Sequence, residues 1–109
     1  MRFVRGSNRW GFRNQGDFFA QDIAGQKQSI DVPEGEAWGE VAAILPPGGV
    51  SFHHSLTFHA SGPNLSGKPR RSFAVHLRTQ NSRPVDDERR GLTEFIDNHD
   101  LCPVIYSRL

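Results

Sequence analysis

The sequence predicts a mainly β fold of three or four antiparallel strands with turn-rich flanks. Two observations support this prediction. Glycine and proline are frequent, with 11 and 7 of the 109 residues, and both punctuate a chain at turns. The stretches between them are short, and their apolar side chains often recur at every second residue, which is the period of a strand. Segments with helical spacing are few.

Four strands are expected, at residues 38–45, 50–54, 56–61 and 70–79. The Pro46-Pro47-Gly48-Gly49 run ends the first strand. A polar turn segment at 62–69 precedes the fourth, in which Phe73, Val75 and Leu77 share one face. This number of strands is small for an independent sandwich or barrel, which usually has about seven or eight.

Short helices and an extended end are expected on either side of these strands. A short apolar helical face is predicted for Phe18, Phe19 and Ile23. A short terminal helix is predicted from the spacing of Leu92, Phe95 and Ile96. The last apolar segment, 102–106, is an edge strand or an extended tail.

Charge and composition exclude several classes of protein. The net charge is +1 and the basic residues are scattered, so no nucleic-acid partner is expected. No apolar run approaches 18 residues, so no membrane partner is expected either. The first residues lack the apolar core of a secretory signal. The one cysteine, Cys102, excludes an internal disulfide and fits a reducing, cytoplasmic location.

The segment 52–64 carries most of the candidate chemistry, because His53, His54 and His59 fall within seven residues. Neutral imidazole is a common ligand for iron, zinc and copper. On the strand at 56–61, His59 shares a face with its hydroxyl neighbours two residues away, Thr57 and Ser61. That face lines a cavity or faces solvent. One of His53 and His54 lines the substrate cavity, or both serve as structural groups. The other histidines, His76 and His99, are expected to be structural or at the surface.

The spacing of this segment is similar to a known motif. His59 is followed by Ser61, Gly62 and Asn64, and Arg70 lies eleven residues after the histidine. This run resembles the C-terminal half of the phytanoyl-CoA dioxygenase (PhyH) family. The segments at 4–11, 48–54 and 70–76 look like the same family, so the resemblance extends over about residues 3–80.

The resemblance implies an iron(II)- and 2-oxoglutarate-dependent dioxygenase acting on a small-molecule substrate. The implied fold is the C-terminal portion of a double-stranded β-helix, a cupin-like jelly roll with short flanking helices. It would form one partial domain, 1–109, with core strands at about 37–79 and a terminal extension at about 80–109. By motif position, His59 is an iron ligand, and Arg70 and Ser61 hold the co-substrate carboxylate. No catalytic residue is implied beyond the metal site.

Two further iron ligands of the family, a His-x-Asp pair, are absent from the sequence. In the family this pair precedes the segment matched by 4–11, so the chain is expected to be truncated. Half a β-helix leaves open sheet edges, so a homodimer or a complementing N-terminal chain is expected. The alternative is a non-catalytic cupin-like binding or oligomerisation module that retains a carboxylate pocket. Arg71 neighbours Arg70 on a strand and is expected to point away from that pocket.

Overall fold

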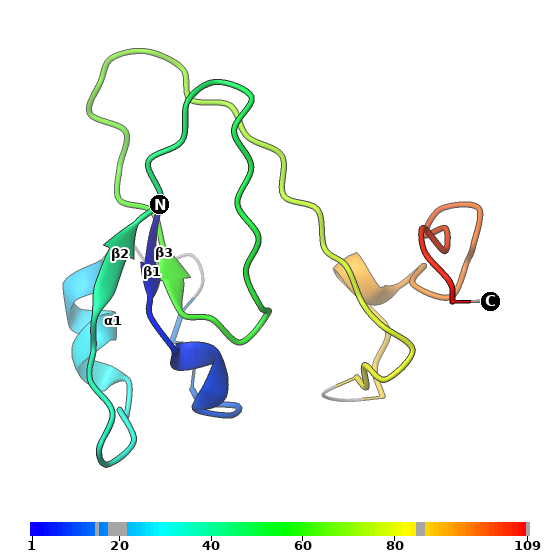
Figure 1. The fold of residues 1–109 in the computed structure, drawn as a ribbon, viewed down its shortest axis with the longest axis horizontal. Coiled ribbons are helices and arrows are strands. Elements are labelled where there is room, and N and C mark those ends of the chain that lie inside the picture. The colour runs from blue at the N-terminus through cyan, green and yellow to red at the C-terminus, as the bar shows by residue number, and fades with distance from the viewer. Residues whose placement is uncertain (15, 18–21, 85–86, 109) are drawn as a thin grey trace. The chain divides into compact units, whose positions relative to one another are not determined.

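The computed structural model describes residues 1–14, 16–17, 22–84 and 87–108. Its chain divides into two compact units, residues 1–70 and residues 71–109. Among the described residues, the regular elements are three short strands, one α-helix and two 3₁₀ turns (Figure 1). The expected antiparallel and mainly non-helical character is therefore confirmed. No helix in this part of the chain has the length and apolar character needed to cross a bilayer.

The first unit is built on a three-stranded antiparallel sheet. Its strands are β1 (Arg2–Val4), β2 (Glu40–Ala42) and β3 (His59–Ala60), in the spatial order β2-β1-β3. β1 is the central strand, and no strand was expected at its position (Figure 1). β2 and β3 lie inside two predicted strands but are shorter than expected.

Phe3 marks the centre of the sheet, because it faces Val41 of β2 on one side and His59 of β3 on the other. The ladder continues one residue beyond β3, where the Val4 N–H donates to the Phe58 carbonyl at 2.9 Å. The N-terminal strand therefore joins two segments that lie about 18 residues apart and holds them in one register. Register matters here, since a one-residue slip would move His59 to the opposite face.

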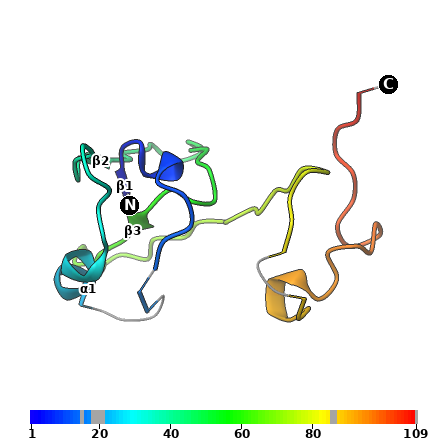
Figure 2. The same cartoon turned by 90° about the horizontal axis from the view of Figure 1, so that it is seen from below.

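The α-helix α1 (Ile23–Ser29) lies beside the sheet (Figures 1 and 2). It begins where the Asp22 side chain accepts a hydrogen bond from the Gly25 N–H at 2.9 Å, as an N-cap residue does. It ends at Ile30, whose backbone is extended. Ile23 is thus the first helical residue, whereas Phe18 and Phe19 lie outside the described residues.

The core of the first unit is small and aromatic. Among the described residues, only Val4, Ser7 and Trp10 are buried. The Trp10 ring lies 6.1 Å from Trp38 and 6.1 Å from Phe58, and the last two rings are 5.9 Å apart. Tilted rings at such distances attract one another beyond their area burial. This cluster holds the 3₁₀ turn η1 (Ser7–Arg9) against β3.

Two of the four predicted strands are wrong for the described chain. Residues 50–54 and 70–79 form no strand hydrogen bonds. The alternation at Phe73, Val75 and Leu77 is present in the sequence, yet their side chains are 100%, 78% and 63% exposed. A strand pattern becomes a strand only when a neighbouring backbone pairs with it, and no described segment does so here.

The second unit contains one regular element, the 3₁₀ turn η2 (Gly91–Thr93). The predicted terminal helix is therefore reduced to a single turn followed by irregular turns up to residue 97. The side chain of Leu92 lies outside what the structure describes. Residues 102–106 form no strand, so the edge-strand alternative is wrong.

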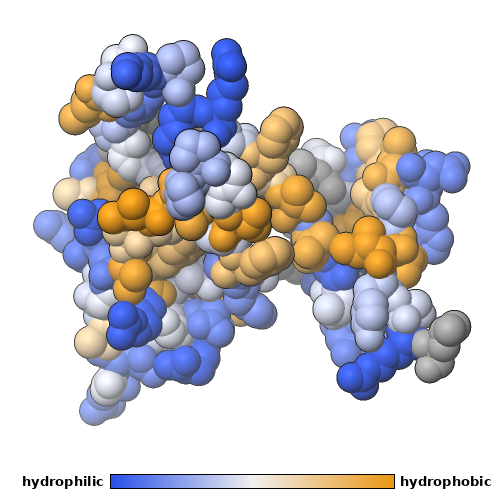
Figure 3. Space-filling model, turned by 45° about the horizontal axis from the view of Figure 1, so that its top comes forward, coloured by the Kyte–Doolittle hydropathy of each residue, from blue (hydrophilic) through white to orange (hydrophobic). Residues whose placement is uncertain are grey.

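Large apolar side chains remain exposed in both units and appear as orange surface in Figure 3. The most exposed, apart from Phe73, are Ile44 at 89%, Phe52 at 87% and Leu65 at 90%. Single exposed apolar residues are ordinary, but this number in a short chain with so few buried residues is not. Much of the hydrophobic surface of the chain is therefore not buried by the described residues.

Candidate functional site

His59 lies on β3, opposite Phe3, and its ring is oriented by its own strand. Its Nδ1 is 2.8 Å from the backbone oxygen of Thr57. Because a carbonyl oxygen only accepts, Nδ1 donates in this contact and carries the proton. The lone pair is then on Nε2. Metal-ligating histidines are commonly fixed in this way, with the second ring nitrogen donating to a carbonyl, so this contact is compatible with a ligand role for Nε2.

The position of His59 depends on a serine that precedes it by about 50 residues. Ser7 is fully buried, and its Oγ donates to the Val4 carbonyl at 2.9 Å. The same Oγ accepts from the Phe58 N–H at 2.9 Å. Gly6 makes this possible, because its φ of 79° turns the chain back after β1. Phe58 directly precedes His59, so Ser7 fixes the backbone that carries the imidazole.

The neighbouring histidines have different surroundings. The His54 Nδ1 accepts from the Leu56 N–H at 3.1 Å, and the His54 carbonyl accepts from the Thr57 N–H at 2.9 Å. His54 thus closes the turn before β3, which favours the structural interpretation. The His53 ring instead lies 4.6 Å from the His59 ring and 4.8 Å from the Phe3 ring.

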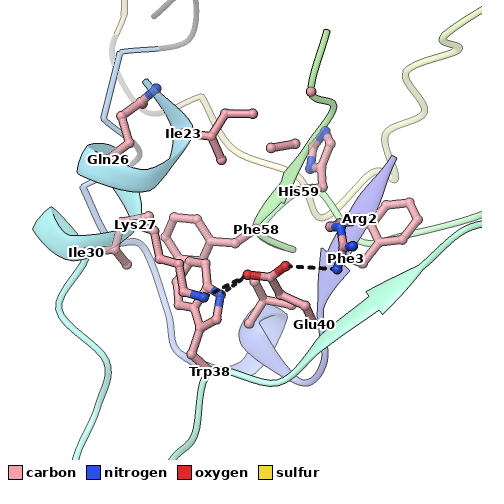
Figure 4. A pocket seen from close by; sticks show the side chains of 13 residues that line it. Arg2, Phe3, Ile23, Gln26, Lys27, Ile30, Trp38, Glu40, Phe58 and His59 are labelled. Atoms are coloured by element: carbon pink, nitrogen blue, oxygen red, sulfur yellow. Dashed lines mark hydrogen bonds and ion pairs between the residues drawn. The ribbon is translucent and has the colours of Figure 1, made fainter. Parts of the chain in front are cut away.

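A cavity of about 360 Å³ lies between α1 and the sheet (Figure 4). On the helix side it is lined by Ile23, Gln26 and Lys27, which follow helical spacing, and by Ile30, which follows the helix directly. The strands contribute Phe3, Val4 and Ala60, and Phe58 lines the cavity from the residue just before β3. His59 also lines this cavity, and together with Phe58 it lines a second cavity of about 330 Å³ that reaches Ser61. An imidazole therefore stands at the wall of a mainly apolar space.

The charged side of the cavity centres on Glu40 (Figure 4). Its carboxylate accepts from the Lys27 Nζ at 2.9 Å and from the Trp38 Nε1 at 2.8 Å, and the Arg2 Nη1 lies 3.4 Å away. The hydrogen bond from Lys27, followed by that from Trp38, lowers the pKa of Glu40 below its ordinary value. Glu40 thus ties α1 to β1 and β2.

Ser61 and Arg70 have different places in the structure. Ser61 lines the second cavity beside His59. Arg70 is exposed and is not among the residues that line either of these two cavities. The loop between them is organised by Asn64, whose Nδ2 donates to the Lys68 carbonyl at 2.6 Å. The Asn64 Oδ1 accepts from both the N–H and the hydroxyl of Ser66, at 3.2 and 2.7 Å. Asn64 therefore sets the path of the chain toward Arg70.

The residues that build the cavity and hold β3 were not predicted from the sequence. Ser7 was noted only as part of a family-like segment, although a serine after a glycine turn and an apolar strand is a usable signal for backbone capping. The contact of Glu40 with Lys27 and Trp38 has no sequence signal, because it depends on how α1 packs on the sheet. Trp10 and Trp38 are packing residues of the aromatic cluster.

The described residues contain no group of three His, Cys, Asp or Glu side chains that could hold a metal ion. His59 fits the role of one imidazole ligand, but iron(II) in a facial site needs three protein groups. The described residues therefore do not form a complete iron site.

The comparison with protein families gives one match. The model of the phytanoyl-CoA dioxygenase (PhyH) family matches residues 1–72 of the 109. This range contains the whole three-stranded sheet, α1, His59, Ser61 and Arg70. No curated protein and no solved structure matches the chain.

The match places the chain in the iron(II)- and 2-oxoglutarate-dependent dioxygenase superfamily. The chain belongs to the phytanoyl-CoA dioxygenase (PhyH) family, whose members are generally dioxygenases that use these two cofactors. The resemblance seen in the motifs is thereby confirmed at the level of the family.

Proposed function

We propose that this chain is part of an iron(II)- and 2-oxoglutarate-dependent hydroxylase, in which it supplies one iron ligand and the co-substrate clamp. The observation that carries this proposal is the orientation of the His59 ring and its position beside the cavities. Its Nδ1 donates to the Thr57 carbonyl and its ring stands at the wall of two cavities. It lies within the family-matched range. When bound, iron would supply the activation of dioxygen.

Arg70 and Ser61 are proposed to hold the distal carboxylate of 2-oxoglutarate. A guanidinium presents a planar fork that matches a carboxylate with two hydrogen bonds. A hydroxyl adds one further donor. Ser61 lines the cavity next to His59, and the Asn64 loop connects it to Arg70. The fold proposed for the complete site is the double-stranded β-helix of the family.

The substrate is proposed to be a small molecule with a substantial apolar part. The cavity between α1 and the sheet is lined by several apolar side chains, with the charged group at Glu40 on one side. Apolar walls with few polar groups are typical of small-molecule sites. The family name is not evidence for phytanoyl-CoA itself, since specificity belongs to the site and not to the fold. The family match does not favour the non-catalytic module.

The remaining iron ligands are proposed to come from another polypeptide. This is either a second copy of the chain or a complementing chain. Two observations support this association. The described residues hold no three-ligand group, and many large apolar side chains are exposed. Sedimentation over a range of concentrations tests it. Association with increasing concentration, or on adding the complementing chain, is expected, and a monomer under both conditions would contradict it.

The clamp is tested by titrating 2-oxoglutarate into the full chain, without oxygen, in the presence of iron(II). Arg70→Ala is expected to weaken binding by tenfold or more, on the order of the 1.5–3 kcal/mol of a charged hydrogen bond. Arg71→Ala is the matched control, because it removes the same charge one residue away. Equal losses in the two variants would show a general charge effect and would contradict the clamp.

The enzymatic part is tested by succinate formation with iron(II), 2-oxoglutarate and dioxygen, in the assembly that sedimentation identifies. We expect His59→Ala to lose turnover and His76→Ala to retain it. Turnover unchanged in His59→Ala would remove His59 from the iron site.

A further inference from the structure

The segment 50–54, which was predicted as a strand, instead brings a second imidazole to His59. The His53 and His59 rings lie 4.6 Å apart with an interplanar angle of 58°. Phe3 lies against both, at 4.8 Å from His53 and 5.9 Å from His59. An aromatic residue of the central strand therefore backs the two imidazoles on one side.

The separation of the two rings matches that of two imidazoles on one metal ion. With metal–nitrogen distances of about 2.0–2.1 Å, two imidazoles at bond angles between square and tetrahedral have ring centroids roughly 4.5–5.2 Å apart. The observed 4.6 Å lies in this range. A large angle between the rings is also compatible with two ligands that approach one ion from different directions. His59 offers its Nε2, because its Nδ1 donates to Thr57.

We propose that His53 and His59 form a two-imidazole site for a divalent transition-metal ion. The chemistry selects iron, cobalt, nickel, copper or zinc over magnesium and calcium, since imidazole suits the former and oxygen ligands suit the latter. His53 would be an additional ligand beside the one that the family motif assigns. This proposal shares His59 with the proposed function but does not require 2-oxoglutarate, Ser61 or Arg70.

The test is calorimetric titration of nickel(II) into the full chain at about pH 7.5, where unperturbed imidazole is mostly neutral. The informative variant is His53→Phe, which keeps a ring against Phe3 but removes both nitrogens. We expect nickel affinity to fall roughly tenfold or more, since even loss of an outer-shell partner of a metal ligand costs about 10–100-fold. His59→Ala should cause a similar loss. His76→Ala, which removes an exposed histidine outside the pair, should cause none.

A second readout counts the ligands directly. Pulsed electron paramagnetic resonance of the chain with one equivalent of copper(II) should show two coordinated imidazoles in the wild type and one in His53→Phe. An unchanged nickel affinity in His53→Phe, or a single coordinated imidazole in the wild type, would overturn the proposal. The His53 and His59 rings would then only pack against each other. If Arg70→Ala loses 2-oxoglutarate binding while His53→Phe keeps its nickel affinity, the proposed function stands. Only the two-imidazole site of His53 and His59 is then rejected.

Discussion

Ser7 and Phe58 are joined by a hydrogen bond that spans 51 residues of sequence, with the Ser7 Oγ accepting from the Phe58 N–H at 2.9 Å. Val4 closes the arrangement, because its N–H donates to the Phe58 carbonyl and its carbonyl accepts from the Ser7 hydroxyl. Both backbone polar groups of Phe58 are therefore engaged by the first seven residues. The turn after the N-terminal strand thus holds the residue that immediately precedes His59.

Ser7→Ala should destabilise the chain because it leaves the Phe58 N–H and the Val4 carbonyl without their partner. The expected loss is about 1–3 kcal/mol in the free energy of unfolding, the usual cost of leaving a buried polar group unpaired. Urea denaturation followed by tryptophan fluorescence measures it, since Trp10 and Trp38 contact Phe58. Ser51→Ala, at an exposed serine, is the matched control. Equal midpoints for the two variants would contradict the role of Ser7.

Trp10 offers a test of what the aromatic cluster requires. Its side chain is only 5% exposed, and within the described residues its Nε1 has no acceptor. Trp10→Ala should cost about 3–5 kcal/mol, the usual range for removing a buried large aromatic ring. Trp10→Phe should cost clearly less, because it keeps a ring toward Trp38 and removes a donor that lacks a partner. Thermal unfolding of the two variants decides this, and equal losses would show that a phenyl ring cannot replace the indole at this position.

The loop between Ser61 and Arg70 should depend on the side chain of Asn64. Asn64→Ala removes all its contacts with Ser66 and Lys68, so the Ser66 amide is expected to exchange with solvent several times faster. Asn64→Asp keeps an oxygen acceptor for Ser66 and loses only the donor to the Lys68 carbonyl. Its Ser66 amide should therefore exchange at nearly the wild-type rate. Hydrogen exchange followed by NMR separates these outcomes, and identical exchange in wild type and Asn64→Ala would refute the assignment.

Sequence patterns predicted the positions of β2 and β3 because both carry local alternation between turn residues. They did not predict β1, since three residues are too short for a period to be visible. The pattern at 70–79 was clear, but Phe73 is fully exposed, because pairing depends on a second backbone that no local pattern reveals. For the candidate site, His59 was selected by motif spacing. The closeness of His53 to His59 depends instead on the turn at His54, which sequence spacing alone did not indicate.

The stability of the first unit should depend on pH through Glu40. Its pKa is lowered in the folded chain, first by the hydrogen bond from Lys27 and then by that from Trp38. A carboxyl group with a lowered folded-state pKa stabilises the fold at pH values above its unfolded pKa, which is about 4.3 for glutamate. That contribution is lost as the pH falls through the folded-state value. Urea midpoints at neutral pH and at acidic pH should therefore differ more in the wild type than in Glu40→Gln.

The matched control for this pH effect is Glu36→Gln, at an exposed position in the loop that leads to β2. It removes one carboxyl group from the same part of the sequence without breaking the contact with Lys27. Its acid-induced loss of stability should equal that of the wild type. Because the Lys27 contact is partly exposed, added salt should reduce the difference between wild type and Glu40→Gln. A Glu40→Gln variant with the full wild-type acid sensitivity would mean that Glu40 does not stabilise the packing of α1 on the sheet.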